Sequence, residues 1–163
     1  ARIRRLEDRA ELGELITRYA LAVDDRDLET LATLFTRDCV FESVKGVERG
    51  REPVKHYYRE RLGEFGPTYH VPHRQALDFQ GEDEATGTVL AHAELAIDGV
   101  TYMVALRYLD HYCREEGHWR SQERKVRQLY AMPLAELPEG LALELRKRWP
   151  GTEPAPGDWP EAP

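Results

Sequence analysis

Hydrophobic residues in the first part of the chain recur at spacings of three and four, which is typical of an amphipathic helix. The pattern predicts one long helix from about Ile3 to Asp24, with apolar positions at Leu6, Leu12, Leu15, Ile16, Tyr19, Ala20 and Val23. At about 100° of rotation per residue, Asp24 falls close to one line with Leu6, Gly13, Thr17 and Ala20. We therefore expect the Asp24 carboxylate on the inward side of the helix, where a carboxylate needs a partner.

Two shorter helices and a strand are predicted before residue 67. Asp27 is a suitable N-cap for a helix over residues 28–35, whose inward stripe is Leu28, Leu31, Leu34 and Phe35. Residues 39–43 alternate between apolar and polar side chains, as a strand does. A third helix is expected over residues 50–62, because Pro53 suits the first turn of a helix.

The pattern changes to long alternating segments after Pro67. Four antiparallel strands are predicted over residues 68–80, 85–97, 100–114 and 118–130, separated by turns rich in glycine and acidic residues. Helices followed by one twisted sheet predict the α+β class. We expect a cone-shaped α+β barrel in which the N-terminal helices pack into a strongly curved, mixed, mostly antiparallel sheet.

Strand alternation assigns the histidines of this sheet to its two faces. His70 lies at the start of a strand, and we expect it to meet Asp24. His73 differs from His70 in parity and is expected on the opposite face, unless a bulge near Pro72 reverses that choice. His92 is expected outside, because the inward face of its strand is assigned to Val89, Ala91, Ala93, Leu95 and Ile97.

The C-terminal part has a different character from the rest of the chain. We predict one α+β domain over residues 1–133 and, over residues 134–163, a helical segment followed by an irregular tail. The helical pattern covers residues 141–149. The tail is either disordered or lies along a groove or a neighbouring subunit, and Trp149 and Trp159 make the second option as reasonable as the first, because exposed indoles would be unusual in a free tail.

Composition narrows the class of partner. A chain of 163 residues with 41% hydrophobic content fits one compact domain. Lys and Arg number 23 against 30 Asp and Glu, and the net charge of −7 without a basic block argues against nucleic acid. No apolar run approaches the roughly 18 residues of a membrane helix. The charged N-terminus resembles neither a secretory signal nor a transit peptide, so we expect a cytoplasmic protein.

Cofactor and metal motifs were not found in the sequence. Cys39 and Cys113 stand alone and are interpreted as free thiols. The glycines form no phosphate-binding loop, so no nucleotide cofactor is expected. The remaining histidines, His56, His111 and His118, have no metal-ligand spacing, and neither serine has an activating motif. We expect no cofactor, no metal and no Ser or Cys nucleophile.

Two stretches resemble a known family. Residues 19–27 (YALAVDDRD), with residues 31–41, resemble the opening of SnoaL-like proteins in the nuclear transport factor 2-like superfamily. Residues 110–124, in which an acidic Gly turn precedes Trp-Arg, resemble the final hairpin of those proteins. The resemblance covers roughly residues 6–130. It implies a cone-shaped fold that hosts dehydratases, dehydrohalogenases, isomerases, cyclases and non-catalytic proteins.

Within the superfamily, the motifs look nearest to those of scytalone dehydratase and hexachlorocyclohexane dehydrochlorinase. The resemblance implies that Asp24 and His70 are the catalytic pair, and that Arg124 corresponds to an arginine of the dehydrochlorinase. The chain departs from these relatives at three positions. Tyr19 occupies the position of a helix lysine in the dehydrochlorinase. Leu95 is near the position of the second catalytic histidine in the dehydratase, and Arg74 occupies the position of an asparagine that many members carry.

The chemistry expected of this pair is proton abstraction. An imidazole has a pKa near working pH, and a carboxylate on its other nitrogen fixes the tautomer and stabilises the imidazolium. His70 would be the base and Asp24 the residue that orients it. Donors toward a leaving group or an enolate, and further contacts with a small apolar or aromatic substrate, are assigned to Tyr19, Tyr69, Arg74, Tyr102 and Arg124.

Plainer interpretations stay open at this point. In these interpretations, Asp24 caps the helix junction or pairs with Arg26 or Arg124, and His70 has only a structural role. The function classes are then a cofactor-independent lyase or isomerase, a non-catalytic binder of a small molecule, and an assembly subunit that uses its outer sheet face. A homodimer or homotrimer is expected, because an open sheet leaves a broad face to cover.

Overall fold

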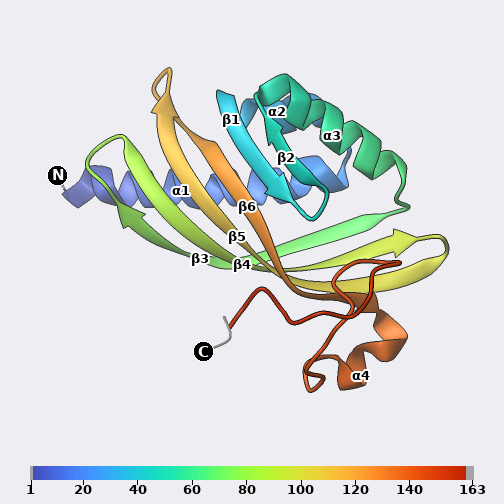
Figure 1. The fold of residues 1–163 in the computed structure, drawn as a ribbon. Coiled ribbons are helices and arrows are strands. Elements are labelled where there is room, and N and C mark those ends of the chain that lie inside the picture. The colour runs from blue at the N-terminus through green and yellow to red at the C-terminus, as the bar shows by residue number, and fades with distance from the viewer. Residues whose placement is uncertain (1, 161–163) are drawn as a thin grey trace.

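A long N-terminal helix lies against the concave side of a curved six-stranded sheet (Figure 1). The structure is a computed structural model that describes residues 2–160. The helices are α1 (Arg2–Asp24), α2 (Leu28–Thr33), α3 (Arg51–Gly63), the 3₁₀ turn η1 (Leu134–Glu136) and α4 (Leu137–Gly140). The strands are β1 (Phe35–Ser43), β2 (Gly46–Arg49), β3 (Thr68–Phe79), β4 (Glu84–Ile97), β5 (Val100–Glu115) and β6 (His118–Pro133).

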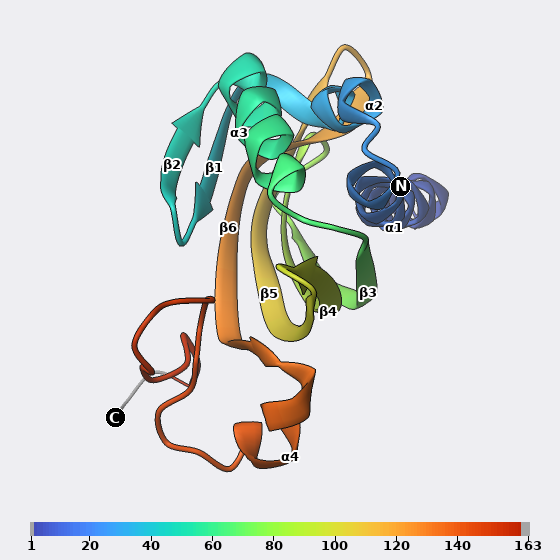
Figure 2. The ribbon, with the colours of Figure 1, turned by 90° about the vertical axis from the view of Figure 1, so that its right-hand side faces the viewer.

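The sheet is mixed and mostly antiparallel. Its strand order is β2-β1-β6-β5-β4-β3, and only β1 and β6 run parallel. The sheet does not close on itself, because β2 and β3 remain at opposite edges, and α1 lies along β3 inside the curve (Figure 2). The predicted α+β class, with helices packed into a curved and mostly antiparallel sheet, is therefore confirmed.

Local sequence signals explain how the chain enters and leaves these elements. Asp27 is the N-cap of α2, since its carboxylate accepts a hydrogen bond of 3.0 Å from the backbone N–H of Thr30. The hairpin between β4 and β5 turns at Asp98-Gly99, with φ of 50° and 76°. Two successive positive φ angles are what a two-residue reversal between twisted strands requires. The position of that predicted turn is confirmed.

The buried face of α1 differs from the expected line. Leu6 is 60% exposed and Thr17 is also exposed, whereas Leu12, Leu15, Ile16, Tyr19 and Val23 are buried against the sheet. On the expected line, Leu6 and Thr17 are thus exposed, whereas Gly13 is half-buried and Ala20 is buried. Asp24 lies beyond Val23 at the end of α1, where the helix meets the start of β3, and it is therefore partly buried.

Two other parts of the secondary structure differ from what the sequence analysis expected. Strand β2 was not anticipated, because it has only four mostly exposed residues that form a short hairpin with the end of β1. The helix expected over residues 141–149 is absent. Leucines in that segment recur at every second position and are exposed, and the backbone of Lys147 and Arg146 bonds to Ala131 and Ala155 instead.

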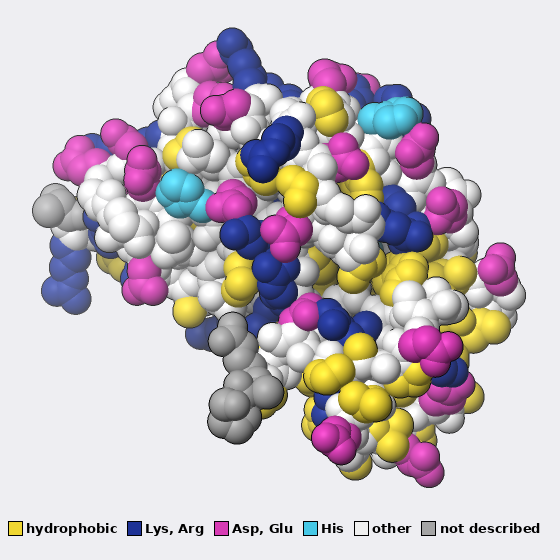
Figure 3. All heavy atoms as spheres, viewed as in Figure 1, with side chains coloured by type: hydrophobic (Ala, Val, Ile, Leu, Met, Phe, Trp, Pro, Cys, Tyr) yellow, Lys and Arg dark blue, Asp and Glu magenta, His cyan; other side chains and the backbone are white. Residues whose placement is uncertain are grey.

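The C-terminal segment folds back onto β6 in the lower part of the molecule (Figure 2). Asp158 pairs with the backbone of Gln128, donating through its N–H at 2.9 Å and accepting through its carboxylate at 2.7 Å. The Arg107 guanidinium lies 4.4 Å from the Trp159 ring centroid. On the face seen in Figure 3, hydrophobic side chains gather around this segment and between it and α3, while both signs of charge are mixed elsewhere. Up to residue 160, the segment is thus packed along its own sheet.

Candidate active site

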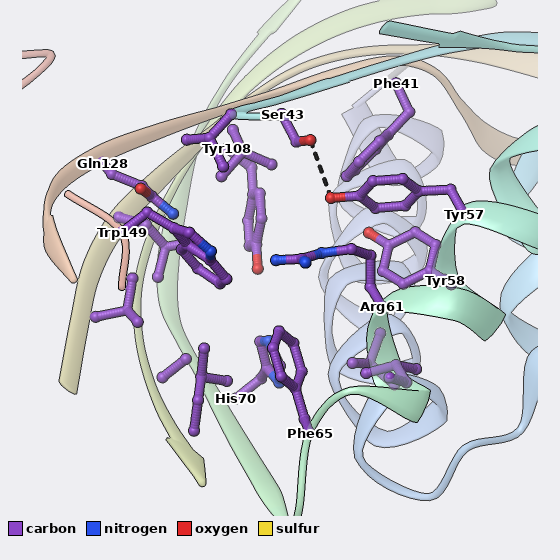
Figure 4. Close-up of a pocket in the computed structure, with 18 of the residues that line it drawn as sticks. Phe41, Ser43, Tyr57, Tyr58, Arg61, Phe65, His70, Tyr108, Gln128 and Trp149 are labelled. Atoms are coloured by element: carbon purple, nitrogen blue, oxygen red, sulfur yellow. Dashed lines mark hydrogen bonds between the residues drawn. The ribbon is translucent and has the colours of Figure 1, made fainter. Parts of the chain in front are cut away.

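A cavity of about 100 Å³, partly open to solvent, lies between α1, α3 and the concave face of the sheet. Its walls are mainly apolar and aromatic, and polar atoms enter from both helices, from the sheet and from the C-terminal segment (Figure 4). The walls come from seven helices and strands and from the C-terminal segment, so no single stretch of sequence forms the cavity. An apolar pocket with a few convergent polar groups is the usual form of a small-molecule site. The lining side chains with polar atoms are Tyr19, Ser43, Tyr57, Tyr58, Arg61, His70, Tyr108, Gln128 and Trp149.

His70 and Asp24 meet at the edge of this cavity. The His70 Nδ1 lies 2.7 Å from the Asp24 Oδ1, and the His70 backbone N–H donates to the Asp24 Oδ2 at 2.8 Å. The ring and the carboxylate are only 16% and 18% exposed. Since His70 is the third residue of β3 and Asp24 the last of α1, the contact joins the end of the helix to the start of the strand. Of these two, only His70 lines the cavity.

Two neighbouring side chains hold this junction in place. The Thr68 hydroxyl donates to the Asp24 Oδ1 at 2.9 Å. Arg26, in a left-handed conformation with φ of 61°, donates to the Thr68 hydroxyl at 2.8 Å and to the Gly66 carbonyl at 2.7 Å. Arg26 therefore bridges the turn after α1 to the start of β3 without pairing with the Asp24 carboxylate. That arrangement contradicts the plainer interpretation in which Asp24 forms an ion pair with Arg26.

The environment keeps the Asp24 carboxylate ionised. Burial alone would raise the pKa of Asp24, but the hydrogen bonds from the His70 ring and backbone, with the attraction of that ring, outweigh it. The pKa of Asp24 is consequently below its ordinary value. A carboxylate is acceptor-only, so His70 carries its hydrogen on Nδ1 when the ring is neutral. The Nε2 lone pair then remains, and no described residue hydrogen-bonds to it.

A cluster of phenols lies on another side of the same cavity. The Tyr19 and Tyr58 hydroxyls are 2.5 Å apart, and the Tyr108 ring centroid lies 5.5 Å from that of Tyr19. Burial raises the pKa of Tyr58 and Tyr108 well above the ordinary value, so both hydroxyls stay protonated. Of the two hydrogens on Tyr19 and Tyr58, one is used between them and the other is available to a ligand.

An ion pair lies beneath these phenols. The Arg124 guanidinium donates to both Asp110 oxygens at 2.8 and 2.7 Å, and the two side chains are 1% and 0% exposed. The Arg124 Cζ lies 4.2 Å from the ring centroids of both Tyr19 and Tyr108. Burial alone would lower the pKa of Arg124, but Asp110 more than compensates, and this pKa lies above its ordinary value. The Arg124 cation therefore packs against the rings of both Tyr19 and Tyr108.

Arg61, Gln128 and Trp149 complete the cavity and were missed by the sequence analysis. Arg61 extends from α3 into the space between the aromatic rings (Figure 4). Its signal was present, because Val54, Tyr58, Arg61 and Leu62 follow the inward spacing of a helix. Gln128 was also within reach, since it lies at the same parity as Arg124 on β6. Trp149 belongs to a segment without periodicity, and no pattern indicated its place.

Comparison with known proteins identifies the family to which this chain belongs. Residues 4–125 match the SnoaL-like domain family, which is about three quarters of the chain. This chain belongs to the SnoaL-like family. An uncharacterized protein of Mycobacterium tuberculosis is 27% identical over 121 residues, which cover 71% of this chain and 81% of that relative. The family assignment agrees with the resemblance in residues 19–41 and 110–124.

Solved structures show the same fold at low sequence identity. A putative scytalone dehydratase of Novosphingobium aromaticivorans has a TM-score of 0.76 at 22% identity, covering 82% of this chain and 91% of that one. A hexachlorocyclohexane dehydrochlorinase of Novosphingobium barchaimii has a TM-score of 0.77 at 22% identity, covering 83% and 95%. The SnoaL-like chain thus has the cone-shaped α+β fold of the nuclear transport factor 2-like superfamily.

Four of the five expected substrate contacts do not line the cavity of this SnoaL-like protein. Tyr19 lies in the wall, as expected. Tyr69 is 60% exposed on the outer face, because its parity in β3 is opposite to that of His70. Tyr102 lies on β5 two positions before the lining residue Val104, and it packs against the hydrophobic core outside the cavity.

The remaining two corrections have different causes. Arg74 would share the parity of His70 in a regular strand, but the register shifts between Pro72 and Arg74, and the side chain is exposed on the outer face. Arg124 faces inward, yet Tyr19 and Tyr108 lie between its guanidinium and the cavity, so it is covered. Its influence on a ligand would pass through those phenols.

His73 and His92 lie together on the outer face of the sheet. The His73 Nε2 is 2.7 Å from the His92 Nδ1, and both residues are exposed. The bulge expected as a possibility near Pro72 is present, but His73 is itself the extra residue and stays outside. The outward position expected for His92 and the outward choice made for His73 are both confirmed.

The other chemical expectations concern thiols, metals and membranes. Cys39 and Cys113 are free, Cys39 is buried, and burial raises the pKa of Cys39 to about 11. Within residues 2–160, no group of three or more His, Cys, Asp or Glu side chains is arranged to hold a metal ion. In the same part of the chain, every helix is too short or too polar to cross a bilayer.

Proposed function

We propose that this SnoaL-like protein is a cofactor-independent lyase or isomerase that removes a proton from a small apolar or aromatic substrate. The observation that carries the proposal is the orientation of His70. Asp24 occupies its Nδ1 at 2.7 Å, while the ring lines a cavity with mainly apolar and aromatic walls. A base in such a position can reach a C–H bond of a bound molecule. The names of the dehydratase and dehydrochlorinase that share the fold support the same class of reaction.

The proposed chemical step uses His70 as the general base. The Nε2 takes the proton, and the electron pair of the C–H bond moves into the substrate. In a lyase this pair forms a double bond while a hydroxyl or halide departs with its own electrons. In an isomerase the pair enters an enolate, and the imidazolium returns the proton to another carbon. The Asp24 carboxylate stabilises the imidazolium in both cases, and general base action contributes about 10²- to 10⁴-fold.

The phenols are the proposed source of electrostatic stabilisation. Negative charge develops on the substrate oxygen or leaving group as the proton is removed, and fixed donors stabilise such charge. The free hydrogen of the Tyr19–Tyr58 pair points to that role, because both hydroxyls are buried in the cavity wall. The buried Arg124 cation, 4.2 Å from the Tyr19 ring, makes that phenol a better donor.

Hydrogen–deuterium exchange tests the proposal without knowledge of the leaving group. The protein is incubated in deuterated water with phenolic ketones, hydroxylated polyketide fragments and halogenated cyclohexanes, and proton NMR follows loss of each C–H signal. We expect exchange or turnover with at least one compound that raises the melting temperature. In His70→Ala and Asp24→Asn, exchange and turnover should be lost. Compounds that bind without any exchange would instead identify a non-catalytic binder.

A further inference from the structure

One permanently charged side chain enters the cavity, and its charge is poorly compensated. Arg61 is 9% exposed and projects from α3 among the aromatic rings (Figure 4). Its guanidinium donates to Glu64 at 2.7 Å, but the Glu64 side chain is 63% exposed. An ion pair with such an exposed partner contributes little free energy. A buried guanidinium normally has a well-shielded anion beside it, so the cavity offers a place for one.

The rest of the lining does not oppose an anion. No Asp, Glu or Lys side chain of the described chain lines the cavity, and the Asp24 carboxylate is turned toward His70 and Thr68. The Arg61 Cζ lies 5.2 Å from the Phe65 ring centroid and 4.9 Å from that of Trp149. These rings hold the guanidinium in position without neutralising its charge. Its planar face and fork of N–H groups suit a carboxylate.

A second polar group in the cavity has no protein partner. Gln128 is 5% exposed, and among the described residues its buried Oε1 accepts no hydrogen bond. A buried polar atom without a partner costs about 1 to 3 kcal/mol of stability. This cost is recovered if a ligand donates a hydrogen bond to the amide. Gln128 points inward from β6, beside the wall formed by Trp149 (Figure 4).

The volume limits how large such a ligand is. An engineered cavity of about 150 Å³ accommodates benzene, and the space here is about 100 Å³. The space is therefore smaller than the cavity that holds one aromatic ring, so a side chain at its boundary must move outward for an aromatic ligand to enter. Trp149 is suited to that movement, because it belongs to the C-terminal segment rather than to the sheet.

We propose that the site recognises a small aromatic acid, with the carboxylate paired to Arg61 and a ring hydroxyl bonded to Gln128. The inference rests on the proposed function for the reaction that follows, but not for the binding itself. Pairing with Arg61 holds the acid in the cavity that His70 also lines, and the proposed reaction additionally requires an activated C–H bond outside the aromatic ring. Specificity for an acid over its neutral amide then comes from the single charge of Arg61.

Calorimetric titration of acids against their amides tests this inference. The probes are benzoate, 3- and 4-hydroxybenzoate, phenylacetate and cinnamate, each beside the matching amide. We expect at least one acid to bind roughly 10- to 100-fold more tightly than its amide, as loss of a charge-assisted pair implies. One hydroxybenzoate should bind more tightly than benzoate, and Gln128→Met should remove that advantage. If no acid binds more tightly than its amide, the pairing of a carboxylate with Arg61 is refuted. If neither hydroxybenzoate binds more tightly than benzoate, the hydrogen bond to Gln128 is refuted.

Substitutions on α3 provide matched controls. Arg61→Met should abolish the preference for the acid, whereas Arg59→Met removes the same charge from an exposed position on α3 and should leave it intact. If the methionine variant does not fold, Arg61→Lys is tested instead. It keeps the charge but not the forked N–H groups, and should weaken acid binding about tenfold. An equal effect of both methionine variants would mean that net charge, not Arg61, selects the acid.

The same titration separates this inference from the proposed function. His70→Ala should bind the acid within about threefold of the unaltered protein, because Arg61 and not His70 carries the charge recognition. Acid binding, together with no deuterium exchange in any bound compound that carries an activated C–H bond, would refute the reaction and leave the ligand class standing. Exchange that is strongest with neutral compounds and unchanged in Arg61→Met would refute the ligand class and leave the reaction standing.

Discussion

Replacing Asp24 by asparagine tests how the dyad sets the protonation of His70. The carboxylate accepts three hydrogen bonds, from the Thr68 hydroxyl, the His70 Nδ1 and the His70 backbone N–H. An asparagine of the same shape can accept on one side only, because its other terminal atom is an NH₂ donor. Each of its two orientations therefore conflicts with a different part of this arrangement.

The backbone N–H of His70 decides between the two orientations. If the asparagine NH₂ faced this N–H, two donors would meet, at a cost of about 1 to 3 kcal/mol. The oxygen should therefore turn to the backbone, which leaves the NH₂ to donate to the His70 Nδ1. The hydrogen of the neutral ring then moves to Nε2, and the atom that faces the cavity becomes a donor instead of a base.

The size of the effect follows from this change of tautomer. In serine proteases the corresponding change lowers kcat by about 10⁴-fold while the geometry stays intact. We expect a decrease of roughly 10²- to 10⁴-fold in exchange or turnover, which is about 3 to 5 kcal/mol of transition-state stabilisation. Loss of one charge-assisted hydrogen bond should lower the melting temperature by only about 2 to 10 °C.

Nitrogen-15 NMR measures the tautomer directly and needs no substrate. Two-bond proton–nitrogen correlations distinguish a protonated Nδ1 from a protonated Nε2 in each histidine. We expect His70 in the unaltered protein to carry its hydrogen on Nδ1 and Asp24→Asn to shift it to Nε2. A spectrum with Nε2 protonated in the unaltered protein, or the same tautomer in both proteins, would refute the reasoning. The exposed pair His73 and His92 serves as an internal reference, since it lies on the outer face.

Three further outcomes are expected. Asp110→Asn should lower the free energy of unfolding by about 3 to 5 kcal/mol, because Arg124 would remain charged and buried; calorimetric unfolding measures this, and a loss below about 1 kcal/mol would contradict it. Burial and the charge of His73 lower the pKa of His92 below 6.5, so the unfolded chain binds protons more readily there. Stability should fall as pH decreases from about 6.5 through the lower folded pKa, and His92→Gln should flatten this dependence of the melting temperature; an unchanged slope would exclude the pair as its source. The open sheet still favours a homodimer or homotrimer, and light scattering that gives a monomer at micromolar concentration would exclude both.

The sequence was most informative where local chemistry decides the structure. Asp27 lies where an N-cap is required, and Asp98-Gly99 provides the two positive φ angles of a tight hairpin. The contact between Asp24 and His70 was also predictable, because it joins the last residue of α1 to the third residue of β3. The family resemblance supplied the pairing of these two elements, which no periodicity in the residues specifies.

The sequence was least informative where the position of a side chain depends on several elements at once. A single extra residue at His73 turns Arg74 to the outer face, and such a bulge depends on pairing with β4 rather than on a local signal. Arg124 was placed on the correct face, but its burial depends on the rings of Tyr19 and Tyr108 from two other elements. Inward orientation is thus necessary for contact with a ligand but not sufficient.

The origin of the polar groups has a consequence for how such a site changes in evolution. The dyad is fixed by one helix end and one strand start, which Arg26 and Thr68 connect by hydrogen bonds. The groups that we assign to recognition come from α3, β6 and the C-terminal segment, none of which contributes to the dyad. Because the two sets share no backbone, substitutions at Arg61 or Gln128 can alter the ligand while the base keeps its geometry. The same fold can therefore retain the proton abstraction that we propose while its substrates differ.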